Sequence, residues 1–220
     1  IVPTANSSGR RTALANWIAS ADNPVTARVF VYRVWNQYFG RGLVDSVNDF
    51  GKMGRKPVNP ALLDYLADRF VKGDWSIKQL QREILLSSVY RQSSDHRADT
   101  QTIDPKNTLL YAFPRQRLDA EQIRDSILYA AGLLEEKLGG PSVFPPIPAN
   151  FDNRNRWTVS ERLADQHRRS AYVFIRRNTP YALLDTFDLA NPNIVHGRRE
   201  VTTTAPQALA LANSELVFEW

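Results

Sequence analysis

Residues 23–40 read NPVTARVFVYRVWNQYFG, and this stretch decides the fold class. Asn23 is a favoured helix cap, and Pro24 suits the first helical position because its missing N–H group has no partner there. Gly40 is a natural left-handed stop for a helix. Between them lies an apolar stripe that comprises Val25, Val29, Tyr32, Trp35 and Phe39. Three further apolar residues widen it: Val31, Val34 and Tyr38. A helix that is apolar on several sides is buried inside a domain.

The same start and stop signals predict further helices. Asn59-Pro60 repeats the cap-and-proline start and Gly73 ends that helix, while Ser76–Gln79 and Thr204–Gln207 fit capping boxes. Asp119 is the predicted cap of a helix that runs to about Lys137, before Gly139-Gly140-Pro141. A shorter helix is expected over residues 11–20, with Leu14, Trp17 and Ile18 on one face. Two more are expected near the end of the chain, one from the Thr204 capping box through Leu211 and one from Asn213 onward.

The second half of the chain is poorer in helix signals. Pro145, Pro146 and Pro148 exclude a helix over residues 142–155, and the alternation over residues 172–177 predicts a short strand or extended segment. We therefore predict a mainly α fold: an irregular multi-helix bundle with a loop-rich second half and at most one short β segment.

The length fits one medium domain or two small ones, and the composition is that of a soluble globular protein. We predict a linker over residues 1–9 and a single mainly helical domain over residues 10–220, truncated at its C-terminus. The chain begins at Ile1 and its only methionine is Met53, so we expect a piece of a longer protein. No apolar run is long enough for a membrane span. With no cysteine, the chain has no disulfide, no thiolate metal site and no Cys-x-x-Cys-His haem attachment.

The formal charge is +5, and the basic residues are 22 arginines and 6 lysines. Arginine binds carboxylate, phosphate and sulfate groups through two parallel hydrogen bonds. Arg33 falls in the most apolar helix, where an unpaired guanidinium would be costly. We predict that it forms a structural ion pair with Asp45 or Asp49, which follow it closely along the chain.

A second block, residues 115–125, mixes arginine with carboxylates at helical spacing. Asp119 is predicted to act as a structural cap and ion-pair partner, and Glu121 lies in the first turn of the helix. The block favours a salt-bridged helix start, although acid–base chemistry stays open. If the arginines of the second half share one surface, an anionic ligand would meet these candidate binding residues: Arg117, Glu121, Arg176, Arg177 and Arg198.

The sequence assigns no catalytic residue and predicts no metal site. The histidines His96, His167 and His196 form no ligand-spaced pair, and Glu161, Asp165 and His167 are only a loose polar cluster. Phosphate-binding loops and the Gly-x-Ser-x-Gly elbow are absent. Few lysines, interspersed acids and no recognition helix make nucleic acid an unlikely partner.

Taken together, ordered blocks over nearly the whole chain, from about residue 10 to the end, resemble the planctomycete-type domain of unknown function fifteen fifty-three, also called the planctomycete surface-type domain. The blocks that carry the resemblance are residues 11–17, 23–24, 33–35, 39–44, 49–51, 90–93, 117–121, 139–143, 168–170, 187–188, 198–199 and 204–209. Residues 188–193 depart from the family pattern, because they are looser than its aspartate-rich turn and lack its cysteine.

The resemblance implies context more than chemistry. Such domains usually lie in large exported proteins, after a sister domain of unknown function and often with a cytochrome-c-like domain. It implies a periplasmic or cell-envelope location, with no cofactor in this fragment and any haem carried upstream. We expect an accessory interaction module that docks against the sister domain. The alternative is an enzyme or binding domain that acts on anionic (sulfated or carboxylated) polysaccharide.

Overall fold

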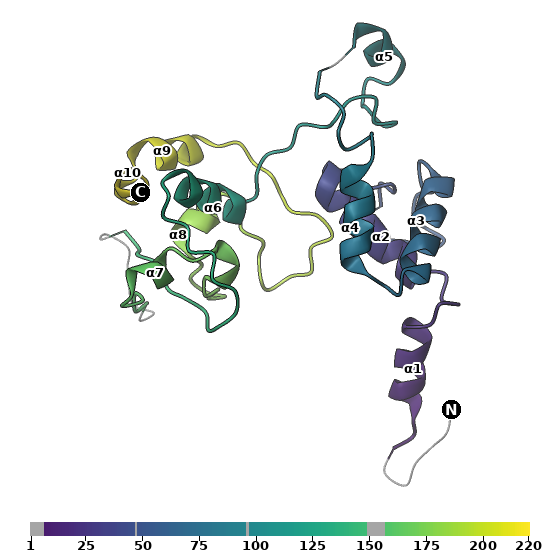
Figure 1. The fold of residues 1–220 in the computed structure, drawn as a ribbon, viewed down its shortest axis with the longest axis horizontal. Coiled ribbons are helices and arrows are strands. Elements are labelled where there is room, and N and C mark those ends of the chain that lie inside the picture. Colours follow the sequence, from purple (N-terminus) through teal and green to yellow (C-terminus); the bar gives the residue numbers. More distant parts are fainter. Residues whose placement is uncertain (1–6, 47, 96, 149–156) are drawn as a thin grey trace. The chain divides into compact units, whose positions relative to one another are not determined.

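The computed structural model describes residues 7–46, 48–95, 97–148 and 157–220, which contain ten α-helices, one short 3-10 helix and no β-strand. The chain divides into two compact units, Ile1–Gln116 and Arg117–Trp220. The mainly α fold with a loop-rich second half is therefore confirmed (Figure 1). That residues 10–220 act as a single domain stays a prediction.

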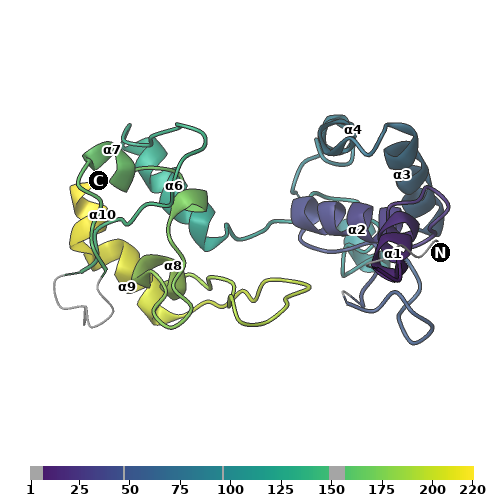
Figure 2. The same cartoon turned by 90° about the horizontal axis from the view of Figure 1, so that it is seen from below.

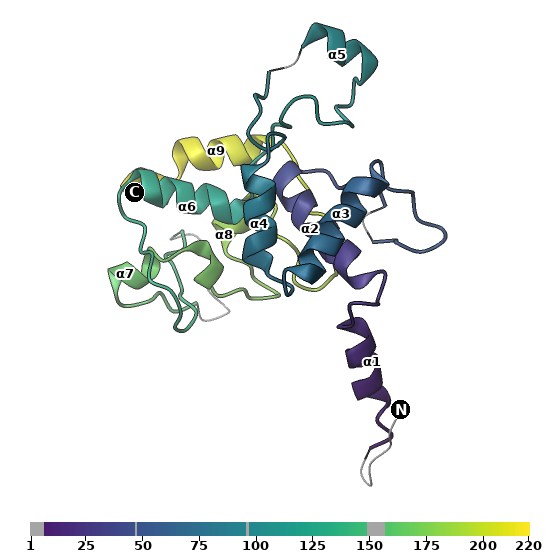
Figure 3. The same ribbon diagram turned by 45° about the vertical axis from the view of Figure 1, so that its right-hand side comes forward.

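The first unit contains α1 (Arg10–Ile18), α2 (Thr26–Phe39), α3 (Pro60–Lys72), α4 (Ile77–Leu86) and α5 (Ala98–Ile103). Helices α2, α3 and α4 pack against one another and lie side by side in Figures 1 and 3. Their buried side chains form one core: Ala27, Val31, Tyr32, Trp35, Phe39, Leu63, Leu66, Phe70, Leu80 and Ile84. The predicted burial of α2 is confirmed, but Val25 precedes the helix and is exposed.

The predicted caps organise these helices. The Asn23 side-chain oxygen accepts hydrogen bonds from the backbone N–H groups of Val25 (2.9 Å) and Thr26 (3.1 Å), so the cap acts as predicted although α2 begins two residues later. Gly40 ends α2 in the left-handed conformation, with φ of 64°. Asn59 caps α3 by accepting from the N–H of Leu62 at 3.0 Å. Local signals thus define the core helices of this unit.

A glycine permits the tight turn after α2. An ideal Cβ atom at Gly42 would lie 2.0 Å from Cε2 of Tyr32, a distance that no real contact reaches. Tyr32 is fully buried, and its ring meets that of Phe50 edge-on at a centroid distance of 5.0 Å. The absence of a side chain at residue 42 therefore allows the turn to close over the core.

Helices α1 and α5 differ from expectation. Helix α1 forms where it was predicted, but it buries no residue, and Leu14, Trp17 and Ile18 are exposed. Its apolar residues therefore add nothing to the core of the first unit. Helix α5 was not predicted, because residues 98–103 show neither an apolar stripe nor a side-chain cap.

The second unit contains α6 (Ala120–Ala130), α7 (Leu163–Gln166), the 3-10 helix η1 (Ser170–Tyr172), α8 (Ala182–Thr186), α9 (Ala205–Asn213) and α10 (Glu215–Glu219). Helix α8 contacts α6 and α9, and α10 follows α9 directly (Figure 2). The core of this unit comprises Ala120, Trp157, Val173, Tyr181, Leu183, Leu184 and Phe187. The capping box at Thr204 and Gln207 and the helix start at Ser214 are as predicted.

Helix α6 ends earlier than the sequence predicted. Gly132 adopts φ of 71°, its N–H donates to the carbonyl of Tyr129 (3.0 Å), and the N–H of Leu133 donates to that of Leu128 (2.9 Å). These two bonds form a Schellman motif, which closes a helix through a left-handed residue. The prediction of a helix through Lys137 was wrong because Gly132, not Gly139, is the stop.

The predicted β segment is minimal. Residues 170–172 form η1, and one isolated parallel bridge joins Val143 to Val173. Residues 142–148 are not helical, as predicted, while the rest of the predicted loop, residues 149–155, lies outside the described residues. In the described parts of the chain, no helix has both the length and the apolar character to cross a membrane.

Candidate functional site

Arg33 lies on the exposed side of α2 and forms no ion pair with any described residue. Asp45 pairs instead with Arg55, at 3.2 Å between Oδ2 and Nη1, and a side-chain oxygen of Asp49 accepts from the N–H of Gly51. The predicted ion pair was wrong, because Arg33 faces away from the stripe that α2 buries. It therefore needs no internal carboxylate.

In the second unit, polar side chains converge on the start of α6, and we call this cluster the α6 latch. It joins α6 to the ends of the α8–α9 connection, and its members are Arg117, Asp119, Glu121, Asp188, Arg199, Thr202 and Gln207. The sequence predicted Arg117, Asp119 and Glu121 as neighbours here. It missed Arg199 and Thr202, because they pair with residues 78 to 85 positions away. It also missed Asp188, whose partners Thr202 and Gln207 lie 14 and 19 positions further along the chain.

The strongest contact of the latch joins Arg199 to Glu121. The two terminal nitrogens of the guanidinium donate to the two carboxylate oxygens, at 2.6 and 2.9 Å. The Nε atom of Arg199 also lies 3.9 Å from Asp119, so the predicted structural ion pairing of Asp119 is present. Burial alone would raise the pKa of Glu121, but the hydrogen bonds and charge of Arg199 outweigh it and the pKa is lowered. Glu121 is thus held as a carboxylate.

The other half of the latch centres on Asp188. Its carboxylate accepts from the N–H (2.8 Å) and hydroxyl (2.7 Å) of Thr202, and hydrogen bonds to that backbone N–H lower its pKa. Gln207 donates to Asp188 and accepts from Arg117 at 2.9 Å. Arg117 also donates to the carbonyl oxygen of Thr202. Each charged group of the latch is therefore engaged by protein.

Of the five predicted ligand-binding residues, two lie in the α6 latch. Arg117 and Glu121 meet in the latch, where both are occupied by internal partners. Arg177 and Arg198 are exposed and have no hydrogen bond or ion pair with the described residues. Arg176 is half-buried and has an internal partner. The latch itself is a structural element, which is the interpretation that the sequence favoured for this block.

Two arginines that the sequence did not single out are buried. Arg124 is 0% exposed and Arg168 is 2% exposed. Arg124 lies four residues after Ala120 and four before Leu128, both fully buried, so helical periodicity was the signal that indicated its burial. The neighbouring Ile123 and Ile127 have the same four-residue spacing, so periodicity alone does not single out the face that carries Arg124.

Arg124 bonds to irregular backbone. Its guanidinium donates to the carbonyl oxygens of Arg168 (2.9 Å) and Gln166 (2.7 Å) and to the hydroxyl of Ser170 (3.1 Å). Burial lowers the pKa of Arg124, and its nearest carboxylate, Asp125, lies 3.7 Å away and accepts from the N–H of Ser170. The side chain therefore supplies hydrogen bonds to backbone that no helix or sheet satisfies.

Arg168 does the same for a second loop. It donates to the carbonyl oxygens of Lys137, Gly139 and Pro141, and its guanidinium carbon lies 3.7 Å from the centre of the Tyr172 ring. Beside it is an open polar cavity of about 390 Å³ whose charged lining residues have mixed signs: Lys137, Glu161, Arg162, Asp165 and Arg168. Such a balance of charges selects no single class of ion.

The structure does not bring Glu161, Asp165 and His167 together as a metal-binding group. No group of three His, Asp or Glu side chains in the described residues is arranged to hold a metal ion. His167 is buried, and its pKa is lowered by desolvation and by the charge of Arg124. Asp165 lies 3.8 Å from Arg162. His167 is thus a neutral core side chain.

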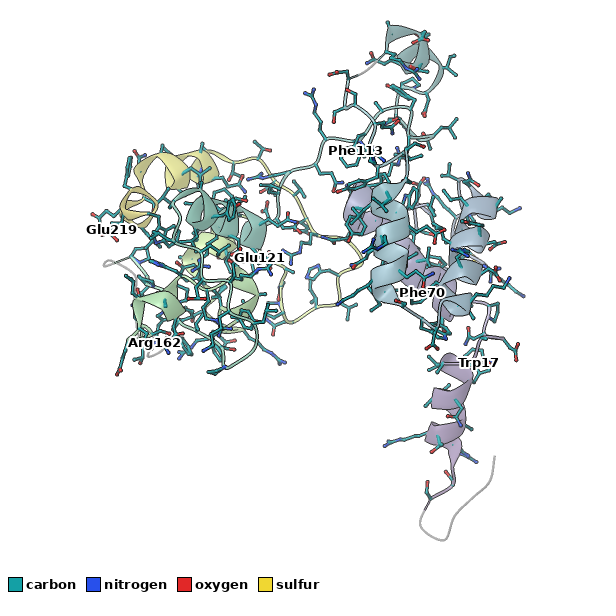
Figure 4. The ribbon with its side chains drawn as sticks, in the orientation of Figure 1. Trp17, Phe70, Phe113, Glu121, Arg162 and Glu219 are labelled. Carbon is teal, nitrogen blue, oxygen red and sulfur yellow. The ribbon has the colours of Figure 1, made fainter. Side chains whose placement is uncertain are left out.

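A larger cavity of about 980 Å³ lies among α8, α9, α10 and residues 146–148. Its lining is mostly apolar, and among the described residues its charged lining side chains are those of Glu215 and Glu219, both on α10 (Figure 4 labels Glu219). The sequence did not predict this cavity, because its walls come from four separate segments of the second unit.

The fold and its polar clusters define a mainly α protein in which Arg117, Arg124, Arg168 and Arg199 join segments that are distant in the sequence. The chain belongs to the family PSD1, described as Protein of unknown function (DUF1553), which it matches over residues 10–220. This agrees with the resemblance seen in the sequence. No curated protein and no solved structure matches the chain significantly.

Proposed function

We propose that the chain is an accessory interaction module, and that it docks against a sister domain through the loop between Asp188 and Arg199. The supporting observation is the tip of this loop, where Ile194 is 59% exposed and Val195 is 88% exposed. The latch fixes both ends of the loop, through Asp188 on one side and Arg199 on the other. An apolar tip on an anchored base is suited to insertion into a partner.

The tip is also ordered by its own hydrogen bonds. Asn191 accepts from the N–H of Asn193 at 2.9 Å, and its carbonyl lies 3.1 Å from Nε2 of His196 and 3.4 Å from the N–H of Ile194. A loop that is ordered before binding loses less conformational entropy on association. This pre-organisation favours specific docking over non-specific adhesion.

The wider setting of the proposal comes from the family resemblance. We propose that the module belongs to a large exported protein of the periplasm or cell envelope, together with the sister domain and an upstream cytochrome-c-like domain that carries any haem. Cell fractionation with an antibody against this chain tests the location. Recovery of the parent protein from the cytoplasm alone would contradict it.

Docking is tested with the separately produced sister domain and the full chain, by calorimetric titration. The Ile194→Ser/Val195→Ser variant should bind at least about tenfold more weakly, because apolar anchors of an interface carry most of its binding energy. The matched control is Met53→Ser/Leu138→Ser, which removes two other exposed apolar side chains and should bind like the wild type. No association at high micromolar concentration of wild-type chain would overturn the proposal.

The second candidate function is binding of anionic polysaccharide. Its support is the exposure of Arg177 and Arg198, which form no ion pair with described residues. Retention on a sulfated polysaccharide column should fall in an Arg177→Ala/Arg198→Ala variant and decline steeply with salt. The control is the Arg91→Ala/Arg115→Ala variant, which removes two arginines of the first unit and should be retained on the column like the wild type. Unchanged retention of the Arg177/Arg198 variant would reject this candidate.

A further inference from the structure

The cavity among α8, α9 and α10 combines size with an apolar lining. Its volume of about 980 Å³ lies at the upper end of the range for small-molecule sites in proteins, roughly 300–1,000 Å³. Its apolar wall comes from all four bounding segments: Pro146, Ile147, Leu183, Pro206, Leu209 and Leu216. A molecule with an apolar body would lose contact with water along most of its length there.

The charges at this cavity have one sign. None of the described residues that line it is basic, and Glu215 and Glu219 are exposed carboxylates that form no ion pair with the described residues. They are four residues apart on α10, so they share a face and repel each other. Glu219 is also the last residue of α10, where the helix dipole favours a positive charge. A cation at this position would relieve both effects.

We propose that this cavity binds a molecule with an apolar body and a cationic end, with the cation held by Glu215 and Glu219. The inference is independent of the proposed docking loop, because none of the loop residues lines the cavity. The apolar wall supplies affinity by burial, and the carboxylates supply the choice between cationic and anionic ligands.

The test uses the full chain and three probes with the same twelve-carbon tail: dodecyltrimethylammonium, dodecyl maltoside and dodecyl sulfate, each below its micelle-forming concentration. Binding is measured by calorimetric titration. We expect saturable one-to-one binding of the cationic probe, on the order of tenfold tighter than the anionic probe at low salt. The Glu215→Gln/Glu219→Gln variant should reduce this preference to near parity while keeping binding of the neutral probe.

Two further variants test the charge and the cavity separately. Glu136→Gln/Glu200→Gln removes two other exposed carboxylates of the same unit and should keep the preference for the cationic probe. Ala210→Trp, which places a ring in the cavity without changing charge, should weaken all three probes. The proposal is overturned by equal binding of the cationic and anionic probes to wild type, by no saturable binding, or by self-association of the chain that Ala210→Trp abolishes.

Discussion

Arg199 and Glu121, which are 78 residues apart in the sequence, form two parallel hydrogen bonds with nitrogen–oxygen distances of 2.6 and 2.9 Å. Both side chains are about one-third exposed, so solvent screens the pair and moderates its strength. The pair ties the long α8–α9 connection to the first turn of α6. Its contribution to stability depends on pH, because one partner is a carboxylate with a lowered pKa.

The Glu121→Gln variant should be less stable than wild type by about 1 kcal/mol at pH 7. The unfolded chain binds the Glu121 proton more tightly than the folded chain, so the stabilisation is complete above the ordinary value of 4.5 and is lost as pH falls through the lowered pKa. Urea unfolding followed by circular dichroism should therefore show the difference shrinking as the pH falls below 4.5. A difference that is constant with pH, or one shared by the control Glu200→Gln, would contradict this.

The Arg124→Met variant should lose about 3 kcal/mol of stability. Methionine fills part of the space but leaves the carbonyl oxygens of Gln166 and Arg168 without the donor that they have now. The midpoint of urea unfolding measures the loss. Arg162→Met, at an exposed position of the same unit, is the control and should change stability little. Equal stability of the two variants would show that Arg124 is dispensable.

Because of His167, the free energy of unfolding should decrease as the pH is lowered below neutrality. Desolvation and the charge of Arg124 lower its pKa below the ordinary value of 6.5, so the unfolded chain takes up this proton first. Stability contributed by neutral His167 is therefore complete above that value and declines as pH falls towards the lowered pKa. Between pH 7 and about pH 5.5, wild type should lose more stability than His167→Gln. His196→Gln, at a half-buried turn, should follow wild type; a slope that survives in His167→Gln would refute the assignment.

The Gly42→Ala variant should destabilise the first unit by about 1–3 kcal/mol, because the new methyl group overlaps the Tyr32 ring and the buried ring must move. Gly51→Ala is the matched control, since its Cβ would meet only a side-chain oxygen of Asp49, at 3.2 Å. Thermal unfolding compares the two. A Gly42→Ala midpoint equal to that of Gly51→Ala would mean that the turn opens without cost.

The helices of the first unit were predictable because their signals are local. A cap such as Asn59 and a stop such as Gly40 act within four residues, so the sequence alone indicates them. The signal that ends α6, Gly132, is also local. The sequence prediction placed the helix end at Gly139-Gly140-Pro141 instead, because two glycines and a proline are a stronger stop signal than one glycine. Helix α5 has no cap and no buried residue, so periodicity offered nothing to detect.

The candidate site was predictable only in part. The order Arg117, Asp119, Glu121 indicated a charged helix start, and the latch lies there. Its other half depends on contacts between residues far apart in the sequence, which no spacing rule supplies. Arg33 and Arg124 both fall among apolar neighbours on a helix, but Arg33 lies off the buried face and Arg124 lies on it.

The embedded guanidinium of Arg124 makes an irregular segment of its unit dependent on helix α6. Residues 166–170 make few regular backbone bonds, and two of their oxygens are served by a side chain that projects from α6. That helix carries its own local start and end signals and can form first. The neighbouring irregular segment depends on it for these bonds, so residues 166–170 should lose hydrogen-exchange protection whenever α6 opens.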